Sequence, residues 1–394
     1  MPAESLAQGL LLPELRLLKT RDPWGSGKME LTVEKTSPME VCPKCATPSS
    51  SVYDRRWARV RDANIRHRRV WLHIRKRRFS CKTCRKPFTE PIQGVRKGAR
   101  TSERFRRDIQ QACENFADLK RVMTTYRCSS GYVYDTHYSV LELRRRTRLY
   151  PWPKAIGLDE HFFKANRLGF REFVSMVVDF SNRRLFEVVE GRRGAELRYA
   201  LSRIPGRENV RAVVTDLSET YRSFARDFFP NAMLIADKFH VIRLLHPAIN
   251  KRRKEITGDR RSLPVRRLLL RNGYRLSRDE RAALFRWLED KHALREVYQA
   301  KEALHRLYRT KGYSRASRAL TKLTDVLALS QLPEIKTFRR TLMRWRDEIL
   351  AYFDWPLTNG PTEGFNGKAK LVKRRAYGYK SFKNYRLQLL NACA

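Results

Sequence analysis

Residues 155–191, "AIGLDEHFFKANRLGFREFVSMVVDFSNRRLFEVVEG", contain three runs rich in Val, Ile, Leu and Phe. Each run has the length of a strand, and "SNRR" between the second and third predicts a hairpin. Further on, "ELRYALSRI" predicts a helix, "VRAVVTD" a strand, "ETYRSFARDFF" a helix and "AMLIAD" another strand. Strands that begin to alternate with helices predict an α/β sheet in this part of the chain.

The composition indicates the class of partner. The 394 residues include 84 Lys and Arg against 41 Asp and Glu, which leaves a formal net charge of +43. An excess of this size predicts a polyanionic partner, with nucleic acid as the leading candidate. No run of about 18 apolar residues exists, so a membrane span is not expected. The first residues lack the apolar centre of a signal peptide, and we expect a soluble intracellular protein.

Two Cys-x-x-Cys pairs, "CPKC" and "CKTC", offer four thiolates: Cys42, Cys45, Cys81 and Cys84. This spacing can close a tetrahedron around Zn²⁺, and the strand-like residues between the pairs predict a zinc ribbon with one pair on each of two hairpin turns. Such an ion stabilises the fold of its module and does no chemistry. The alternatives are another metal or cluster, or no metal. The other cysteines, Cys113, Cys128 and Cys393, are interpreted as buried or incidental thiols.

The stretch "IRHRRVWLHIRKRRFS", residues 65–80, predicts a strand with almost no acidic residues. Its cations repel one another unless phosphates neutralise them. We therefore predict that Arg75, Arg77 and Arg78 contact DNA. The alternative is a solvated basic face.

Helical patterns follow the second cysteine pair. Residues 102–126 predict a helix, "RCSSG" a break, and the residues from about Ser130 a second helix. Such a pair resembles a helix-turn-helix whose second helix reads DNA, although helix pairs often only pack together. "YPWP", residues 150–153, predicts a linker. From Phe239 to about Tyr352 the pattern is charged, amphipathic and helical throughout.

Three acidic residues stand at positions that suit catalysis. Asp159 lies in the first strand of the α/β segment, Asp216 ends the strand "RAVVTD", and Glu363 opens a later helix. Acids at the carboxyl ends of apolar strands lie where α/β active sites form. In an RNase H-like sheet three such acids meet and hold two Mg²⁺ or Mn²⁺ ions, which act on a phosphodiester. The alternative treats each Asp as a helix cap or turn residue.

Several blocks resemble the ISL3 family of insertion-sequence transposases. They are "IGLDEHFF", "VVTDLSETYRSFARDFFPNAMLIADKFHVIRLLH" and "LTNGPTEGFNGKAKLVKRRAYGYKSFKNYRLQLL", together with the two cysteine blocks, in the same order from about Cys42 to the C-terminus. The resemblance implies a DDE transposase whose RNase H-like core is split by an all-helical insertion. It places Asp159, Asp216 and Glu363 on the catalytic triad, and it implies DNA contacts by Lys368, Lys370, Lys373, Arg374 and Arg375.

Other residues near these blocks have less certain roles. Asp237 and His240, in "DKFHV", are interpreted as a hydrogen-bonded structural pair in preference to direct help with proton transfer. Tyr377 and Tyr379 are candidates either for stacking on splayed bases or for the core. Glu160 follows Asp159 in the strand, so we expect it to point to the opposite face.

We therefore predict an α+β multidomain protein that binds the terminal inverted repeats of an insertion sequence, then cleaves and transfers DNA strands. The resemblance implies a homo-oligomer on DNA in the bacterial cytoplasm, associated with the nucleoid. The alternative is a zinc-ribbon and helix-turn-helix DNA-binding regulator without catalysis. The expected parts are a lead-in (1–40), a zinc ribbon (41–95), a helix-turn-helix region (96–149), a first core part (150–255), a helical insertion (256–350) and a C-terminal core part (351–394).

Overall fold

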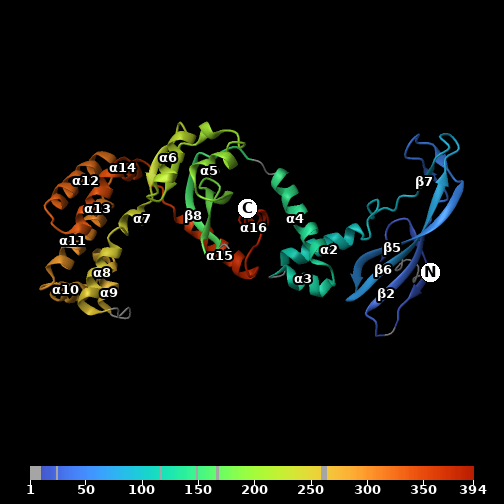
Figure 1. The fold of residues 1–394 in the computed structure, drawn as a ribbon, viewed down its shortest axis with the longest axis horizontal. Helices are drawn as coiled ribbons and strands as arrows, with labels where there is room; N and C mark the ends of the chain where they lie inside the picture. The colour runs from blue at the N-terminus through green and yellow to red at the C-terminus, as the bar shows by residue number, and fades with distance from the viewer. Residues whose placement is uncertain (1–9, 24, 116–117, 148–149, 166–167, 259–263) are drawn as a thin grey trace. The chain divides into compact units, whose positions relative to one another are not determined.

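The computed structural model describes residues 10–23, 25–115, 118–147, 150–165, 168–258 and 264–394. The chain divides into two compact units, Met1–Leu143 and Arg144–Ala394, and each is described by itself (Figure 1). None of the helices in the described ranges combines the length and apolar character needed to cross a bilayer.

The first unit contains a five-stranded sheet. Its order is β1 (Leu15–Arg21), β2 (Lys28–Lys35), β6 (Arg68–Ser80) and β5 (Val52–Ile65), and β7 (Pro87–Thr89) also pairs with β6. β2 and β6 are parallel, whereas β5 and β6 form a long antiparallel hairpin. Alternate residues of these strands, among them Val60, Val70, Leu72 and Ile74, are buried in one core.

The strand predicted over residues 65–80 begins only at Arg68. Arg66 and His67 have φ values of 48° and 63° and form the two-residue turn between β5 and β6. Two successive left-handed residues match the twist of a tight hairpin, so the sequence before Arg68 belongs to the turn and to β5.

Among the described residues of the first unit, α2 (Glu103–Asn115), α3 (Leu119–Tyr126) and most of α4 (Ser130–Thr147) follow the sheet. The single helix expected over residues 102–126 is therefore two helices. The Asp118 carboxylate accepts a hydrogen bond from Arg121 N and so caps a new helix start. The expected break before Ser130 is present, with Arg127 in the left-handed conformation. Phe105, Val122 and Val133 share the core of these helices.

The second unit is built around a mixed sheet. Its order is β10 (Arg184–Glu190), β9 (Arg171–Asp179), β8 (Ala155–Ala165), β11 (Ala212–Thr215) and β12 (Met233–Ala236). β10, β9 and β8 are antiparallel neighbours, and β11 runs parallel to both β8 and β12. The predicted strands and the hairpin at residues 181–184 are confirmed.

Helices cover both faces of this sheet (Figure 1). α5 (Gly194–Leu201) and α6 (Glu219–Phe228) pack on one face, and α15 (Gly360–Arg375) and α16 (Phe382–Ala392) pack on the other. Trp152, predicted to lie in a linker, is 2% exposed and belongs to the first of these cores. Its ring centroid lies 4.9 Å from that of Phe186 and 4.8 Å from that of Phe229, so Trp152 anchors this stretch in the core.

The predicted helical segment is confirmed. Its helices are α7 (Lys238–Ile242), α8 (His246–Thr257), α9 (Pro264–Leu270), α10 (Arg278–Trp287), α11 (His292–Leu307), α12 (Tyr313–Ala328), α13 (Pro333–Arg344) and α14 (Arg346–Asp354). Short 3₁₀ helices occupy Arg207–Asn209 and Gly273–Arg275. α7 to α14 bury one common core, which also contains Ala236 of β12. The helical segment is therefore continuous with the edge of the sheet.

Candidate active site and zinc-ribbon cluster

Two knuckles of the same shape bring the four cysteines together. The first lies between β3 (Glu40–Val41) and β4 (Pro48–Ser49), and the second between β6 and β7. In each, the residue after the second cysteine is left-handed: Ala46 has a φ of 56° and Arg85 a φ of 53°. This conformation turns the chain back so that both thiols of a pair point to the same side.

The four Sγ atoms all lie within 4.8 Å of one another. Cys42 Sγ is 3.7 Å from Cys84 Sγ, and Cys45 Sγ is 3.4 Å from Cys81 Sγ. A tetrahedron with Zn–S bonds of about 2.3 Å has S···S edges of about 3.8 Å, so the cluster has the size of a zinc site.

Hydrogen bonds favour the ionised form of Cys42 and Cys45, whereas at Cys84 the Lys86 backbone hydrogen bond is outweighed by burial and the neighbouring thiols, which raise the pKa to about 11. The backbone N–H of Lys44 lowers the pKa of Cys42. The Thr47 hydroxyl and backbone lower the pKa of Cys45 to about 6. Because the thiolate is the zinc ligand, these donors prepare the site for metal. The four-cysteine cluster therefore supports a structural Zn²⁺.

A row of acidic residues follows the parallel strands of the second unit. Thr215 of β11 pairs with Leu158 of β8 and with Ala236 of β12. The next residue on each strand is acidic: Asp159, Asp216 and Asp237. The strand register therefore places the three carboxylates side by side, at neighbouring positions about 4.8 Å apart along the sheet.

The start of α15 is fastened to this row by hydrogen bonds. Asn359 N donates to Asp237 Oδ1 over 2.9 Å, and Asn366 Nδ2 donates to Asp159 Oδ2 over 2.8 Å. Glu363 lies one turn before Asn366 on the same helix, and its side chain is exposed. The register and these two bonds bring the part of α15 that carries Glu363 to Asp159 and Asp216.

α15 packs so closely against β8 that the strand has a glycine, Gly157, at the point of contact. A Cβ at Gly157 would lie 2.5 Å from Thr362 Oγ1 and 2.6 Å from Asn359 Oδ1. Both Asn359 and Thr362 are fully buried. A larger residue at position 157 would therefore push the helix away from the strand.

Burial raises the pKa of both Asp159 and Asp216. Burial raises the pKa of Asp159 to about 6, and the nearby Asp216 charge adds to that shift. Burial also raises the pKa of Asp216, with Glu160 as a further negative charge. Because the charge of each ionised carboxylate is poorly solvated, a bound cation would favour ionisation of both.

Asp237 and His240 form the predicted hydrogen-bonded pair. His240 Nδ1 and Asp237 Oδ2 are 2.9 Å apart, and Asp237 caps α7 by accepting from His240 N. Burial alone would raise the pKa of Asp237, but the bonds from His240 and Asn359 lower it. The same bond, with the charges of Asp237, Asp216 and Asp159, raises the pKa of His240. The pair thus holds α15 to the sheet and places positive charge beside the acids.

Asp159 and Asp216 occupy neighbouring positions in the sheet, but they do not form a closed cluster with Glu363. Within the described residues, the four cysteines are the group of three or more potential ligands whose ligand atoms lie within 4.8 Å of one another. The Glu363 side chain is exposed on α15. The three carboxylates offer the hard oxygen donors that Mg²⁺ and Mn²⁺ prefer, in an open arrangement.

The predicted DNA-contacting arginines of the ribbon differ in their surroundings. Arg75 is exposed. Arg77 Nε donates to Oε2 of the buried Glu90 over 2.9 Å, and Arg77 Nη2 donates to Ser37 O over 2.6 Å. Arg78 Nη1 donates to Asp54 Oδ2 over 2.9 Å. Arg77 and Arg78 thus have intramolecular partners that the local sequence did not predict.

The basic residues after Glu363 also differ in exposure and in their hydrogen-bond partners. Exposed side chains on α15 belong to Lys368, Lys370, Arg374 and Arg375. Lys373 instead donates from Nζ to Phe162 O over 2.8 Å. Of the two tyrosines, Tyr377 is 91% exposed, whereas Tyr379 packs against the core under α15 and α16. The core alternative therefore holds for Tyr379 but not for Tyr377.

Sequence reasoning missed two of the polar residues that position the acids, Thr362 and Asn366, whereas Asn359 was expected to belong to the turn that fixes Glu363. Asn359, Thr362 and Asn366 recur at helical spacing around Glu363 and face the sheet. That spacing in "NGPTEGFN" was the signal that could have identified them. Glu160 was predicted to point away from Asp159, and its carboxylate pairs with Arg192 over 2.8 Å.

Comparisons with known proteins extend over most of the chain. A family model for ISL3-type transposases, described as Transposase, matches residues 156–389. A second model, the zinc-finger of transposases IS204/IS1001/IS1096/IS1165, matches residues 38–84. These ranges include both the acidic row with α15 and the cysteine cluster.

Individual relatives agree with this assignment. The chain is 26% identical over 375 residues to the transposase for insertion sequence element IS1001 of Bordetella parapertussis, which covers 92% of this chain and 90% of that protein. It is 22% identical over 259 residues to the IS1557 transposase of Mycobacterium tuberculosis, covering 58% and 57%. A match of 32% over 107 residues, to a Lactococcus lactis protein named ATP-dependent protease, covers 27% of this chain.

The first family model alone covers more than half of the sequence, from β8 to α16. This chain belongs to the ISL3 family of transposases.

Proposed function

We propose that the chain is a DDE transposase that binds the terminal inverted repeats of an insertion sequence and catalyses metal-dependent DNA strand cleavage and transfer. The observation that carries the proposal is the strand register that places Asp159 beside Asp216, with α15 held there by the Asn366–Asp159 hydrogen bond. Family membership makes DNA the expected substrate.

The sheet supports an RNase H-like core. Three antiparallel strands, β10, β9 and β8, are followed by β11 and β12 parallel to β8, and helices lie on both faces. In this proposal residues 150–255 and 351–394 form the core, and residues 256–350 are the helical insertion. The zinc ribbon (41–95) and the α3–α4 pair, as a helix-turn-helix within residues 96–149, would bind the element ends.

Asp159, Asp216 and Glu363 would hold two Mg²⁺ or Mn²⁺ ions. Ions held in this way activate the attacking oxygen and stabilise the leaving oxygen of a phosphodiester. The chain's own residues orient the ligands: Asn366 fixes one Asp159 oxygen, and Asp237 fixes the start of α15 through Asn359 N. His240 is hydrogen-bonded to Asp237, and its raised pKa favours the protonated form beside the acids.

Exposed cations of both units would hold the phosphates of element ends and target DNA. On α15 these are Lys368, Lys370, Arg374 and Arg375, and on the ribbon Arg75. Their contribution to affinity falls as salt concentration rises, because each neutralised phosphate releases counterions. Assembly of two or more copies on paired ends is part of the same proposal.

Strand nicking tests the catalytic assignment. Labelled duplexes that contain the inverted repeats flanking the coding sequence are incubated with protein and Mn²⁺. Asp216→Asn keeps the size of the side chain but removes its charge, and we expect nicking to fall by at least about 100-fold. Asp227→Asn, an exposed acid on α6, is the control and should nick normally. Equal nicking by wild type and Asp216→Asn would overturn the assignment.

A second candidate is a DNA-binding regulator without catalysis. The open arrangement of the three carboxylates is the observation on its side. Metal titration separates the two: a regulator binds zinc but has no Mn²⁺ site that disappears in Asp159→Asn and Glu363→Gln. The enzyme is preferred because a regulator has no need for acids at three registered positions.

A further inference from the structure

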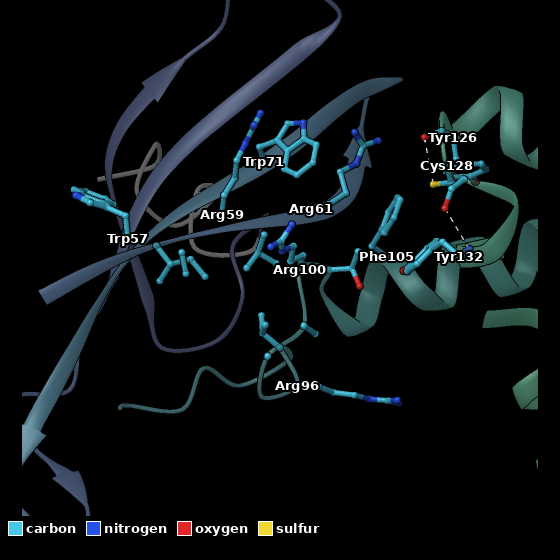
Figure 2. A pocket seen from close by; sticks show the side chains of 18 of the residues that line it. Trp57, Arg59, Arg61, Trp71, Arg96, Arg100, Phe105, Tyr126, Cys128 and Tyr132 are labelled. Atoms are coloured by element: carbon cyan, nitrogen blue, oxygen red, sulfur yellow. Dashed lines mark hydrogen bonds between the residues drawn. The ribbon is translucent and has the colours of Figure 1, made fainter. Parts of the chain in front are cut away.

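A cavity of about 800 Å³ lies within the first unit, and its lining includes none of the four cluster cysteines (Figure 2). One wall is formed by β5 and β6, with Trp57, Arg59, Arg61 and Trp71, and the opposite side by the helical residues Phe105, Tyr126 and Tyr132. Its volume is within the range of pockets that enclose a small ligand. No role proposed above uses this cavity.

The walls of the cavity are held together by hydrogen bonds. Arg61 N donates to Arg100 O over 2.8 Å, and Ser102 N donates to Arg61 O over 2.9 Å. Ser102 Oγ donates over 2.6 Å to Oδ1 of Asp62, which is buried and also accepts from Arg104 Nε over 2.7 Å. The start of α2 is therefore attached to β5, and hydrogen bonds fix the two walls of the cavity relative to each other.

The lining is cationic and aromatic. Six Lys or Arg side chains and five Trp, Tyr or Phe side chains line the cavity, and among its described lining residues none is acidic. The Arg59 guanidinium lies 4.2 Å from the centroid of the Trp71 ring. A site that combines fixed positive charge with ring faces fits a ligand with both an anionic group and a flat aromatic group.

Arg61 supplies an independent indication of a ligand. It is only 6% exposed, and its guanidinium lies 5.1 Å from the Phe105 ring centroid and 5.5 Å from that of Trp71. One Nη donates to Asn64 Oδ1 over 2.7 Å, but the buried Nε has no hydrogen-bond partner. A buried donor of a charged group is costly to leave unpaired, so an acceptor such as a phosphate oxygen is expected.

The Trp57 side chain offers an aromatic surface on which a base could stack. Although it lines the cavity, it is 66% exposed, which is unusual for a tryptophan in a folded unit. Exposed aromatic side chains beside cations stack on bases that are not paired in a duplex. A base inside intact duplex DNA offers only its edge, in the grooves.

We propose that this cavity binds an unpaired nucleotide of DNA, with its phosphate at Arg61 and Arg100 and its base against Trp57. The inference rests on the proposed function in taking DNA as the substrate. It adds that the first unit recognises a distorted or frayed position in the bound DNA, in addition to duplex phosphates.

Binding measurements with matched probes test the proposal. Zinc-loaded full-length protein, without Mg²⁺ or Mn²⁺, is titrated into three labelled DNAs of one sequence: a paired duplex, the same duplex with one internal unpaired adenine, and the duplex with a short 3′ overhang. The readout is the ratio of each affinity to that for the paired duplex. Wild type should prefer at least one unpaired probe by about 5-fold or more, and the two probes distinguish an internal flipped base from a frayed end.

Two variants remove the proposed contacts, and one serves as control. Trp57→Ala and Arg100→Gln should each bring the ratio close to one. Tyr53→Ala removes an equally exposed aromatic side chain of β5 that does not line the cavity, and it should keep the wild-type ratio. Circular dichroism verifies that the variants fold.

Each result has a separate meaning. A wild-type ratio of one, or an unchanged ratio in Trp57→Ala, overturns the proposal for the cavity. If the protein does not bind the paired duplex either, it is the DNA-binding function that fails. The nicking assay with Asp216→Asn remains an independent test of catalysis, because it reads the acidic row and not this cavity.

Discussion

The zinc-ribbon knuckles and the acidic row both collect anionic ligands, but they do so by different means. The four thiols come from two short hairpins and lie within 4.8 Å of one another. The acids of the row come from three neighbouring strands, and hydrogen bonds from Asn366 and Asn359 attach α15 to two of them. A closed thiolate cluster makes zinc part of the fold, whereas the open row leaves room for ions and a substrate phosphate.

The largest effect should come from the ribbon. Cys81→Ser removes a buried ligand, and because a structural zinc site contributes about 10 kcal/mol or more in zinc-finger peptides, we expect the ribbon to unfold. Zinc content should fall from about one per chain to near zero, and limited proteolysis should cut within residues 38–84. Cys128→Ser, outside the cluster, should keep its zinc.

Withholding Mg²⁺ tests whether the acidic row, unlike the zinc ribbon, keeps its fold without a metal ion. Since protein groups hold the acidic row, the wild-type proteolysis pattern should not change without Mg²⁺. If Mg²⁺ removal exposes the second unit to the protease as strongly as Cys81→Ser exposes the ribbon, the contrast between the two sites is wrong.

The next effect concerns the attachment of α15. Asp237→Ala removes the acceptor for Asn359 N and the partner of His240, and it leaves a buried N–H unpaired. We expect a loss of about 3 kcal/mol in the free energy of unfolding of the second unit, together with weaker nicking. Chemical denaturation followed by tryptophan fluorescence measures the loss.

Asp237→Asn is the matched variant. It retains an oxygen that can accept from Asn359 N, so its loss should be clearly smaller. Equal losses for Asp237→Ala and Asp237→Asn would mean that the charge of Asp237, and not its bond to α15, is what stabilises the unit.

Substitution of Gly157 tests the packing of α15 against β8 with a smaller change. Gly157→Ala places a methyl group 2.5 Å from Thr362 Oγ1, so α15 must shift, at a cost of about 1–3 kcal/mol. Gly364→Ala, in α15 itself, has open space around its Cβ and should be neutral or stabilising. Thermal unfolding compares the two. Similar midpoints for both variants would show that the helix is not seated against Gly157.

The smallest effect is on pH dependence. Because burial raises the pKa of Asp159 to about 6, its ionisation costs stability in the folded protein. The stabilising contribution of the protonated form is complete below the ordinary pKa of about 3.9 and is lost as pH rises through about 6. Mn²⁺ must displace this proton, so Mn²⁺ affinity and nicking should rise through about pH 6 and then level off.

Mn²⁺ titrations at several pH values, compared with Asp159→Asn, measure this dependence. A wild-type affinity that does not change between pH 5 and pH 7 would exclude Asp159 as a ligand that must lose a proton.

The local part of this protein could be predicted from its sequence. The strands of residues 155–191, the cysteine knuckles and the long helical segment follow from apolar periodicity and from ligand spacing within a few residues. Boundaries were missed where a single backbone choice decided them, at the Arg66–His67 turn and at the Asp118 cap. The three candidate acids were expected to converge within a few ångströms; the strand register places Asp159 beside Asp216, whereas Glu363 is exposed and the three form no closed cluster.

Only the tertiary structure decided what each polar group contacts. The pairing of Arg77 with buried Glu90, the bond from Asn366 to Asp159, and the cavity behind Trp57 each join residues distant in sequence. The periodicity of hydrophobic residues and the spacing of ligands predict the conformation of a segment, because that conformation depends mainly on residues close in sequence. The partner of a buried charge depends on which elements the cores bring together, and that information is absent from any single stretch.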